Sequence, residues 1–492
     1  MEVIVTRGSE IDQYYTKKAR EIADFAVQKL HLSFDNVEFR FVDEDKLAEA
    51  VALYENPLPH WTTGQTYKLY KGMNQSMSHL YEMVGHSYVN PYDGKEYIIA
   101  YLNNTNKEYD NLSVMAHVYG HVHIMKNNII GRIKEPRLNK YNAYKDTYKS
   151  LEKMLDEKTV SDIYDAGESL ASLLDMYPDI RENTNDYYST DKDFPNKDEY
   201  NAMDFVVEHS TLNKWEKDFL RMTADIHSEI AESRIKILHE GFASYVENKY
   251  IEELAKTDPE NSFSMRAKMI DILSPLNSAQ LPYALGFRVF NEIEQRMNQG
   301  GYSDLAKFLS GKSVNDGEKG LDQILNVVKY STDWEFIFSF LDKAFLKKYV
   351  KEIFKNQSAI YGIEYDLTAE DEEYIEDIAD NFRMRMLLRT GNYKPIVYIP
   401  KGKGNFRGGL LLEQDFTFLS RYVGVKDAEL EETIKENSGF LTMNNHETHN
   451  ALMRIAKVYG RPVTLKTIDE NKGTPILIRA DKDKVDISEF KQ

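Results

Sequence analysis

The chain contains no cysteine among its 492 residues, and this absence limits how it can be held together. Disulfides, thiolate nucleophiles, iron–sulfur clusters and zinc ribbons are all excluded by it. The fold must therefore depend on an apolar core, for which 33 Tyr and 23 Phe provide ample surface. A chain of this length needs no metal to hold its fold, so a metal bound here would serve chemistry.

Targeting signals and net charge narrow the classes of protein further. The N-terminus lacks the basic and apolar regions of a secretory signal, and no run of about 18 apolar residues occurs. We therefore expect a cytoplasmic protein without membrane insertion. The net charge of −18 argues against nucleic-acid binding, because that binding depends on cations that neutralise phosphates.

Changes of pattern along the chain predict a predominantly helical α+β protein in four parts. Residues 1–135 are expected to form an amino-terminal α/β part and residues 136–211 an acidic helical insertion. Residues 212–365 are expected to form a helical core, and residues 366–492 a small carboxy-terminal α/β domain.

Local patterns predict the first elements. A Ser/Glu capping pattern with apolar residues at helical spacing predicts a helix over residues 9–30, and period-two alternation predicts a strand over residues 37–42. EYIIAYL, which ends at Leu102, is a second expected strand, followed by a helix over about residues 106–126. Residues 56–79, which precede EYIIAYL, are expected to form an irregular segment that enters a helix near Leu80.

The first motif with chemical meaning is AHVYGH, within that second helix. His117 and His121 are four residues apart, which places them on one helix face within reach of a single ion. His123 lies about 200° around the helix from His121 and should face elsewhere.

The second motif is HEGFASY, in the helical core. On a helix its Glu240 belongs to a polar stripe, which is either a solvated surface or the lining of a buried polar cavity. The stripe consists of Glu229, Ser233, Lys236, Glu240, Ser244 and Glu247.

Two His and one Glu are the ligand set of a catalytic zinc with an open fourth position for water. The Gly-x-Ala after Glu240 resembles the ligand segment of aminopeptidase-type gluzincins, which implies a zincin-like amino-terminal and middle region. Those enzymes carry a Glu immediately after the first His as general base, where this chain has Val118. A hydrogen-bond network without a metal is the alternative for these three side chains.

Other motifs favour simpler interpretations. None of the twelve His has Glu three positions earlier, which excludes a di-iron bundle. Residues 446–449 predict a helix start with capping polar residues, and the glycine-rich residues 402–409 predict a hairpin loop rather than a phosphate loop.

Eight segments, taken in order, carry a resemblance that covers nearly the whole chain. They are PLPHWTTGQTY (57–67), YEMV (81–84), IIAYL (98–102), AHVYGH (116–121), HEGFASY (239–245), LPYALGF (281–287), RTGNY (389–393) and YGRPV (459–463). Together they resemble the stage V sporulation protein R (SpoVR) family. His239 stands where that family usually has Asn, and Phe242 where it usually has Trp.

The resemblance implies a cytoplasmic protein associated with assembly of the spore cortex, a peptidoglycan layer. No settled reaction accompanies the family, so a possible enzymatic activity must be argued from the residues. We expect a divalent metal on His117, His121 and Glu240, and this ligand set favours zinc. His239 would either join the ligands or orient one of them.

The reaction expected at such a site is metal-assisted hydrolysis of an amide in a peptide or peptidoglycan-like substrate. Glu82, His60, Tyr119 and Tyr245 are the candidate acids and bases. The alternative, which Val118 favours, is a non-catalytic metal-binding or regulatory protein that acts through protein–protein interaction. The sequence does not identify the substrate, the partner or the oligomeric state.

Overall fold

The computed structural model divides the chain into two compact units. Unit 1 comprises Met1–Lys149 and Ala231–Asn392, and unit 2 comprises Ser150–Ile230 and Tyr393–Gln492. The structure describes residues 2–55, 81–90, 93–129, 144–173, 194–228, 234–274, 281–298, 320–352, 395–419 and 428–490, except 145, 148, 152, 172, 196, 343 and 418. Outside these ranges it describes Thr368 and Glu373. The predicted division into four parts stays a prediction.

Unit 1 contains a five-stranded mixed sheet in the order β2-β1-β3-β5-β4. The three inner strands are parallel, and the two edge strands run antiparallel to their neighbours. Most apolar residues of the inner strands are buried, as expected for parallel strands covered on both faces. The strands are β1 (Val3–Arg7), β2 (Glu10–Ile11), β3 (Asn36–Val42), β4 (Tyr81–Val89) and β5 (Glu96–Asn103).

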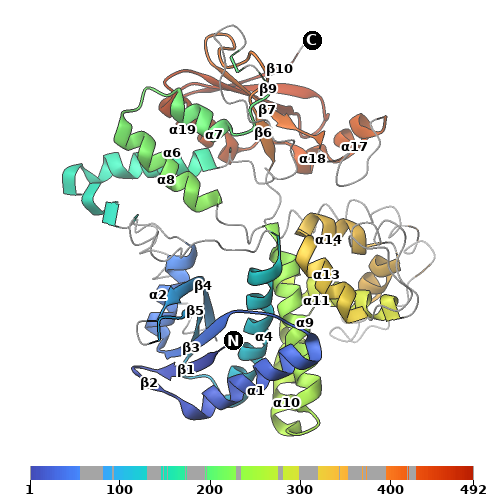
Figure 1. Ribbon diagram of the computed structural model, residues 1–492. Coiled ribbons are helices and arrows are strands. Elements are labelled where there is room, and N and C mark those ends of the chain that lie inside the picture. The colour runs from blue at the N-terminus through green and yellow to red at the C-terminus, as the bar shows by residue number, and fades with distance from the viewer. Residues whose placement is uncertain are drawn as a thin grey trace. The chain divides into compact units, whose positions relative to one another are not determined.

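Helices cover this sheet and build the rest of unit 1. Figure 1 shows the sheet between α2 on one side and α1 and α4 on the other, with α9 next to α4. The helices are α1 (Gln13–Leu30), α2 (Glu44–Glu55), α4 (Glu108–Asn127), α9 (Lys236–Leu254), α10 (Pro259–Ile272), α11 (Leu281–Asn298), α13 (Gly320–Tyr330) and α14 (Asp333–Phe340).

Two local predictions for unit 1 are wrong. The first helix begins at Gln13 rather than at residue 9, because the Asp12 side chain caps it by accepting from the Tyr15 N–H while Glu10 and Ile11 pair with β1. No helix begins near Leu80 in the residues that are described there, since Tyr81 starts strand β4, which pairs with β5. The strand at residues 37–42, EYIIAYL and the helix after it are confirmed.

Most of helix α4, and α9 from Ile237 to Glu247, are buried on every side rather than along one stripe. In α4 every residue from Asp110 to Met125 is buried, polar side chains included. A helix enclosed in this way lies inside the protein, and its polar groups must find partners there. His117 and His121 of α4 therefore face Glu240 and Glu247 of α9, and not solvent.

Glycines allow these helices to approach closely. A Cβ atom on Gly120 of α4 would lie 2.6 Å from the Cα of Ala243 on α9. A Cβ on Gly241 of α9 would lie 2.4 Å from the Cα of Gly286 on α11. Both separations are too short for any side chain. Gly120 therefore sets the distance between α4 and α9, which carry the two sequence motifs, and Gly241 sets the distance between α9 and α11.

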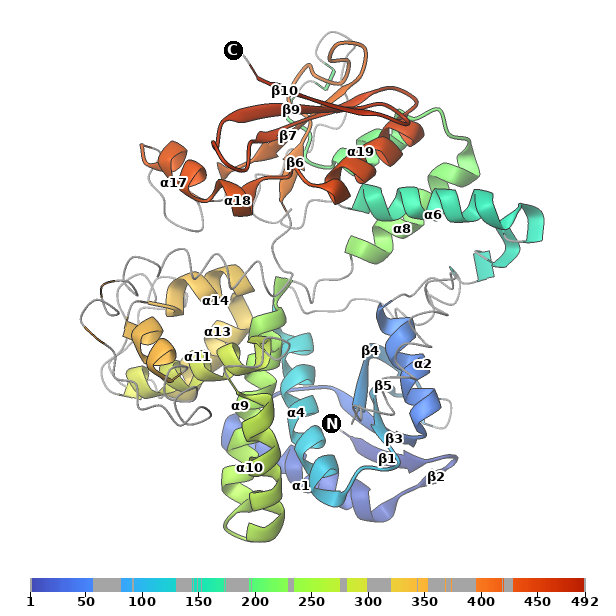
Figure 2. The ribbon, with the colours of Figure 1, turned by 180° about the vertical axis from the view of Figure 1, so that it is seen from behind.

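Unit 2 has a second five-stranded sheet, in the order β10-β9-β8-β7-β6, with helices against it. Figure 2 shows α19 lying along this sheet beside α6. The strands are β6 (Ile396–Tyr398), β7 (Leu410–Asp415), β8 (Val463–Ile468), β9 (Pro475–Ala480) and β10 (Val485–Glu489). The helices are α6 (Glu157–Ala171), α7 (Ala202–Glu208), α8 (Lys214–Ser228), α17 (Leu430–Glu436), α18 (Ser438–Leu441) and α19 (His446–Tyr459).

Two further predictions for this unit are confirmed. The Asn445 side chain caps α19 by accepting from the Thr448 N–H at 2.8 Å, so residues 446–449 are a helix start. Strands β6 and β7 pair antiparallel around the glycine-rich segment, in which Gly402 and Gly408 have positive φ values. The predicted α+β class with a helical majority is confirmed for the described residues.

Candidate metal centre

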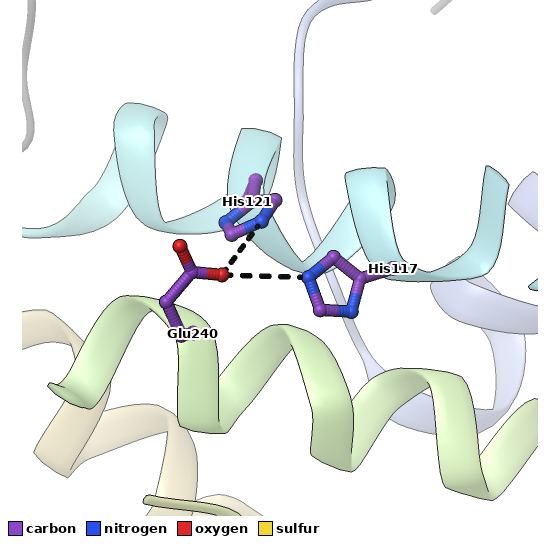
Figure 3. A group of neighbouring side chains, drawn as sticks. All are labelled: His117, His121 and Glu240. Carbon is purple, nitrogen blue, oxygen red and sulfur yellow. Dashed lines mark ion pairs between the residues drawn. The ribbon is translucent and has the colours of Figure 1, made fainter. Parts of the chain in front are cut away.

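Three buried side chains meet between α4 and α9 (Figure 3). His117 and His121 point from successive turns of α4 toward Glu240 on α9. The Glu240 Oε2 atom lies 3.5 Å from His117 Nε2 and 3.4 Å from His121 Nε2. The structure therefore brings together the three ligands that the two sequence motifs predicted.

These separations fit a metal ion better than they fit direct contact. At 3.4 to 3.5 Å the atoms are too far apart for strong hydrogen bonds. Ligand atoms about 2.0 to 2.2 Å from a tetrahedral zinc ion lie about 3.3 to 3.6 Å from one another. Glu240 Oε2 is also buried and accepts no hydrogen bond from the described residues. A metal ion between the three side chains would give this oxygen a partner.

Lys236 fixes the orientation of the Glu240 carboxylate. Its Nζ atom lies 2.7 Å from Glu240 Oε1, four residues along the same helix, and leaves Oε2 directed at the imidazoles. Burial favours the neutral acid, but Lys236 and the two imidazoles hold the pKa of Glu240 well below its usual range. Glu240 is therefore an anion at neutral pH.

Glu247 and Ser113 lie behind His117. Glu247 Oε2 is 2.9 Å from His117 Nδ1, and the Ser113 hydroxyl donates to the other Glu247 oxygen. Burial would lower the pKa of His117, but the adjacent carboxylates of Glu240 and Glu247 raise it to about 9. A positive charge between these side chains is thus favourable, whether it is a proton on His117 or a divalent cation.

His239 lies behind the second imidazole. Its Nε2 atom is 3.3 Å from His121 Nδ1, on the side of the ring away from Glu240. Burial lowers the pKa of His121 well below its usual range and the pKa of His239 to about 4. Both rings are neutral at pH 7, which is the state in which imidazole binds a metal.

The polar stripe of α9 is buried from Glu240 onward. Only 7% of the Glu240 side chain is exposed, whereas Lys236, at the start of the helix, is 43% exposed. Ser244 and Glu247 are buried as well, which favours a buried polar cavity over a solvated surface. Glu229 and Ser233 lie outside the described residues.

Of the four predicted acids and bases, the structure describes the side chains of Tyr119 and Tyr245. Tyr119 donates from its hydroxyl to the Ala19 backbone carbonyl at 2.8 Å, so this group is directed at α1. The Tyr245 ring packs against Phe242 and Phe290, and burial raises the pKa of its hydroxyl. Neither residue contacts the three ligands in the interactions described.

The remaining two candidate acids and bases cannot be placed. His60 lies outside the described residues, as does the side chain of Glu82, although its backbone belongs to β4. His123, which was expected to face elsewhere, accepts at Nδ1 from the Ser33 N–H at 3.0 Å.

Asp333 fixes the start of α9 and therefore the position of Glu240. It is the first residue of α14, and its carboxylate accepts from the Ile237 and Leu238 N–H groups at 2.9 and 2.8 Å. Backbone N–H groups at a helix start have no partner within the helix, so these two bonds make Asp333 an effective cap. Burial raises the pKa of Asp333 to about 8, against the opposite effect of the N–H groups that it binds. The residues on either side of this contact are about 96 positions apart in the chain.

The sequence did not assign roles to Glu247, Ser113, Lys236 or Asp333. The polar stripe already placed Glu247 and Lys236 on the same helix face as Glu240, so the sequence could have suggested that they support it. Ser113 lies four residues before His117 on α4, and that spacing could also have suggested it. Asp333 gave no signal, because its contact joins distant parts of the chain.

A mainly helical α+β fold with a buried His-His-Glu group defines a candidate metal-binding protein. Residues 10–193 and 178–384 match the family described as SpoVR like protein, so the chain belongs to the SpoVR family. Membership of this family suggests a sporulation-related protein. No curated protein matches the chain, and no solved structure does. In the part of the chain that is described, no helix is long and apolar enough to cross a membrane.

Proposed function

We propose that His117, His121 and Glu240 bind a divalent metal, most favourably zinc, and that the site hydrolyses an amide. The observation that supports this proposal best is the spacing of the three ligand atoms, with Glu240 Oε2 at 3.4 and 3.5 Å from the two imidazole nitrogens. Three protein ligands leave a fourth position open, as in catalytic rather than structural zinc sites. The zincin-like character of this region is part of the same proposal.

The surrounding side chains prepare each ligand for this role. Glu247 accepts the Nδ1 proton of His117, so that Nε2 presents its lone pair toward Glu240. His239 accepts the Nδ1 proton of His121 in the same way, which gives it an orienting function rather than a place among the ligands. Lys236 binds Oε1 of Glu240 and leaves Oε2 for the ion.

A bound divalent cation supplies Lewis acidity, which polarises a carbonyl oxygen and makes water a better nucleophile. The proton acceptor must come from elsewhere than in most zincins, because the residue after the first histidine is the buried Val118. Among the candidates we favour Glu82 and His60, since the hydroxyl of Tyr119 is engaged by Ala19. The substrate class is a peptide or a peptidoglycan-like molecule, in keeping with the cortex association that the family resemblance implies, and the place of action is the cytoplasm.

The second candidate function is a non-catalytic metal-binding or regulatory protein that acts through protein–protein interaction. Val118 favours it, because an aliphatic side chain in this position cannot take a proton from water. The buried ligand set would be retained in this case for binding the metal alone.

Amide hydrolysis tests which of the two functions applies. Zinc-loaded parent protein is incubated with peptide amides and with peptidoglycan fragments, and newly formed amino groups are counted. We expect slow hydrolysis that chelators abolish, that zinc restores and that Glu240→Ala lowers at least 100-fold, because the reaction needs the bound cation.

Glu252→Ala, on an exposed position of the same helix, is the matched control and should keep the parent rate. Hydrolysis that persists in both chelator-treated protein and Glu240→Ala would contradict the hydrolase proposal. Zinc-loaded protein that cleaves no substrate would favour the regulatory function.

A further inference from the structure

Unit 2 contains a cavity of about 400 Å³, separate from the metal ligands of unit 1. It lies between the sheet, the end of α6 and one face of α19. Its size is within the range of ligand-binding pockets, and its floor is apolar and nearly inaccessible to solvent. The floor is formed by Leu173, Val397, Leu412, Leu452 and Leu465.

Short side chains on α19 keep this cavity open. Thr448 and Ala451 line it from the first turns of the helix, three residues apart and hence on one face. A long side chain at position 451 would project into the space above the floor. The cavity is thus a consequence of the α19 sequence and not a gap between loosely joined elements.

Carboxylates outnumber cations among the described residues that line the cavity. Glu168 of α6 and Glu447 of α19 both line it, and Glu447 is exposed. Among the described residues of the lining, the one cation is Arg454, whose guanidinium lies 3.8 Å from Asp165. Residues 150–230, which supply the α6 wall, contain 20 Asp and Glu against 8 Lys and Arg.

An apolar floor beneath an acidic mouth matches a particular ligand chemistry. An apolar side chain would fill the floor, because that surface gains most from exclusion of water. Cationic groups on either side would face the exposed Glu447 carboxylate, and the net charge of −18 of the chain would attract them from a distance. We propose that this cavity binds a segment of a partner protein in which a large apolar residue is flanked by lysines or arginines.

This inference goes beyond the metal centre and does not depend on hydrolysis. It is tested with the full-length protein and fluorescein-labelled pentapeptides by fluorescence anisotropy. The probe is Lys-Lys-Phe-Lys-Lys, and the comparison peptides replace either the Phe with Gly or each Lys with Glu. We expect the probe to bind at least 10-fold more tightly than both, and to weaken as salt is raised.

Two substitutions connect the binding to this cavity. Ala451→Phe fills the space and should lower affinity at least 10-fold, and Glu447→Lys should lower it about 3- to 10-fold without changing the core. Glu432→Lys, at an exposed position of α17, makes the same charge change away from the cavity and should have little effect. Glu447→Lys keeps the test valid if Ala451→Phe fails to fold.

Three results would overturn the proposal. The first is no binding of the Phe probe, and the second is equal binding of the Gly peptide, which would indicate charge attraction alone. The third is equal loss of affinity in Glu447→Lys and Glu432→Lys, which would place the contact elsewhere.

Discussion

Gly241→Ala should destabilise unit 1 and remove metal binding together. The new methyl group would lie 2.4 Å from Gly286 Cα and 2.5 Å from the Gly286 carbonyl carbon, so backbone and not a flexible side chain must move. Overpacking a core costs about 1 to 3 kcal/mol and more where backbone shifts. Displacement of α9 would also carry Glu240 away from the imidazoles. Denaturant unfolding and zinc stoichiometry measure the two effects.

Gly439→Ala is the control, because the nearest atom to its added Cβ is 3.9 Å away. It should leave both stability and zinc content near those of the parent. Gly120→Ala, whose Cβ would meet Ala243 Cα at 2.6 Å, should behave as Gly241→Ala does. A Gly241→Ala protein of parent stability and full zinc content would show that helix spacing does not set the site.

Glu247→Ala should weaken zinc binding about 10- to 100-fold, the usual cost of losing a partner that orients a metal-binding histidine. Glu247 holds His117 Nδ1 at 2.9 Å, and without it the ring can rotate or present the wrong nitrogen. Zinc dissociation constants from chelator competition give the effect. Ser113→Ala, which removes only the bond that holds Glu247, should cost less.

Two further variants distinguish a loss of His117 positioning from a general loss of protein stability. Glu247→Gln keeps an oxygen that accepts the His117 proton, so it should recover part of the affinity. Glu252→Ala removes an exposed carboxylate from the same helix and should leave zinc affinity unchanged. If Glu247→Ala bound zinc as the parent does, the role assigned to Glu247 would be wrong.

The grouping of His117, His121 and Glu240 could be predicted from the sequence because its parts are local. A spacing of four residues places His117 and His121 on one helix face whatever the rest of the fold does. The strand before them was predictable too, since EYIIAYL is a compact apolar run that ends in an Asn-rich turn. What the sequence left open was whether the stripe that carries Glu240 is buried, because burial depends on the helices around it.

The supporting contacts join distant segments and gave weaker signals. Glu247 lies 130 residues from His117, and Asp333 lies 96 residues from Ile237. Strand β4 was mistaken for a helix because it is an edge strand whose pairing with β5 determines its conformation. The first helix began later than predicted because Asp12, and not Ser9, has the conformation and hydrogen bond of a cap.

Zinc content tests the central claim most directly. Protein purified without a histidine tag and without chelators is measured together with its His117→Ala and Glu240→Ala variants. We predict about one zinc per chain in the parent and little in either variant, because each removes one of three ligands. Parent protein that is free of metal, and that takes up no ion on dialysis against zinc, would contradict the account.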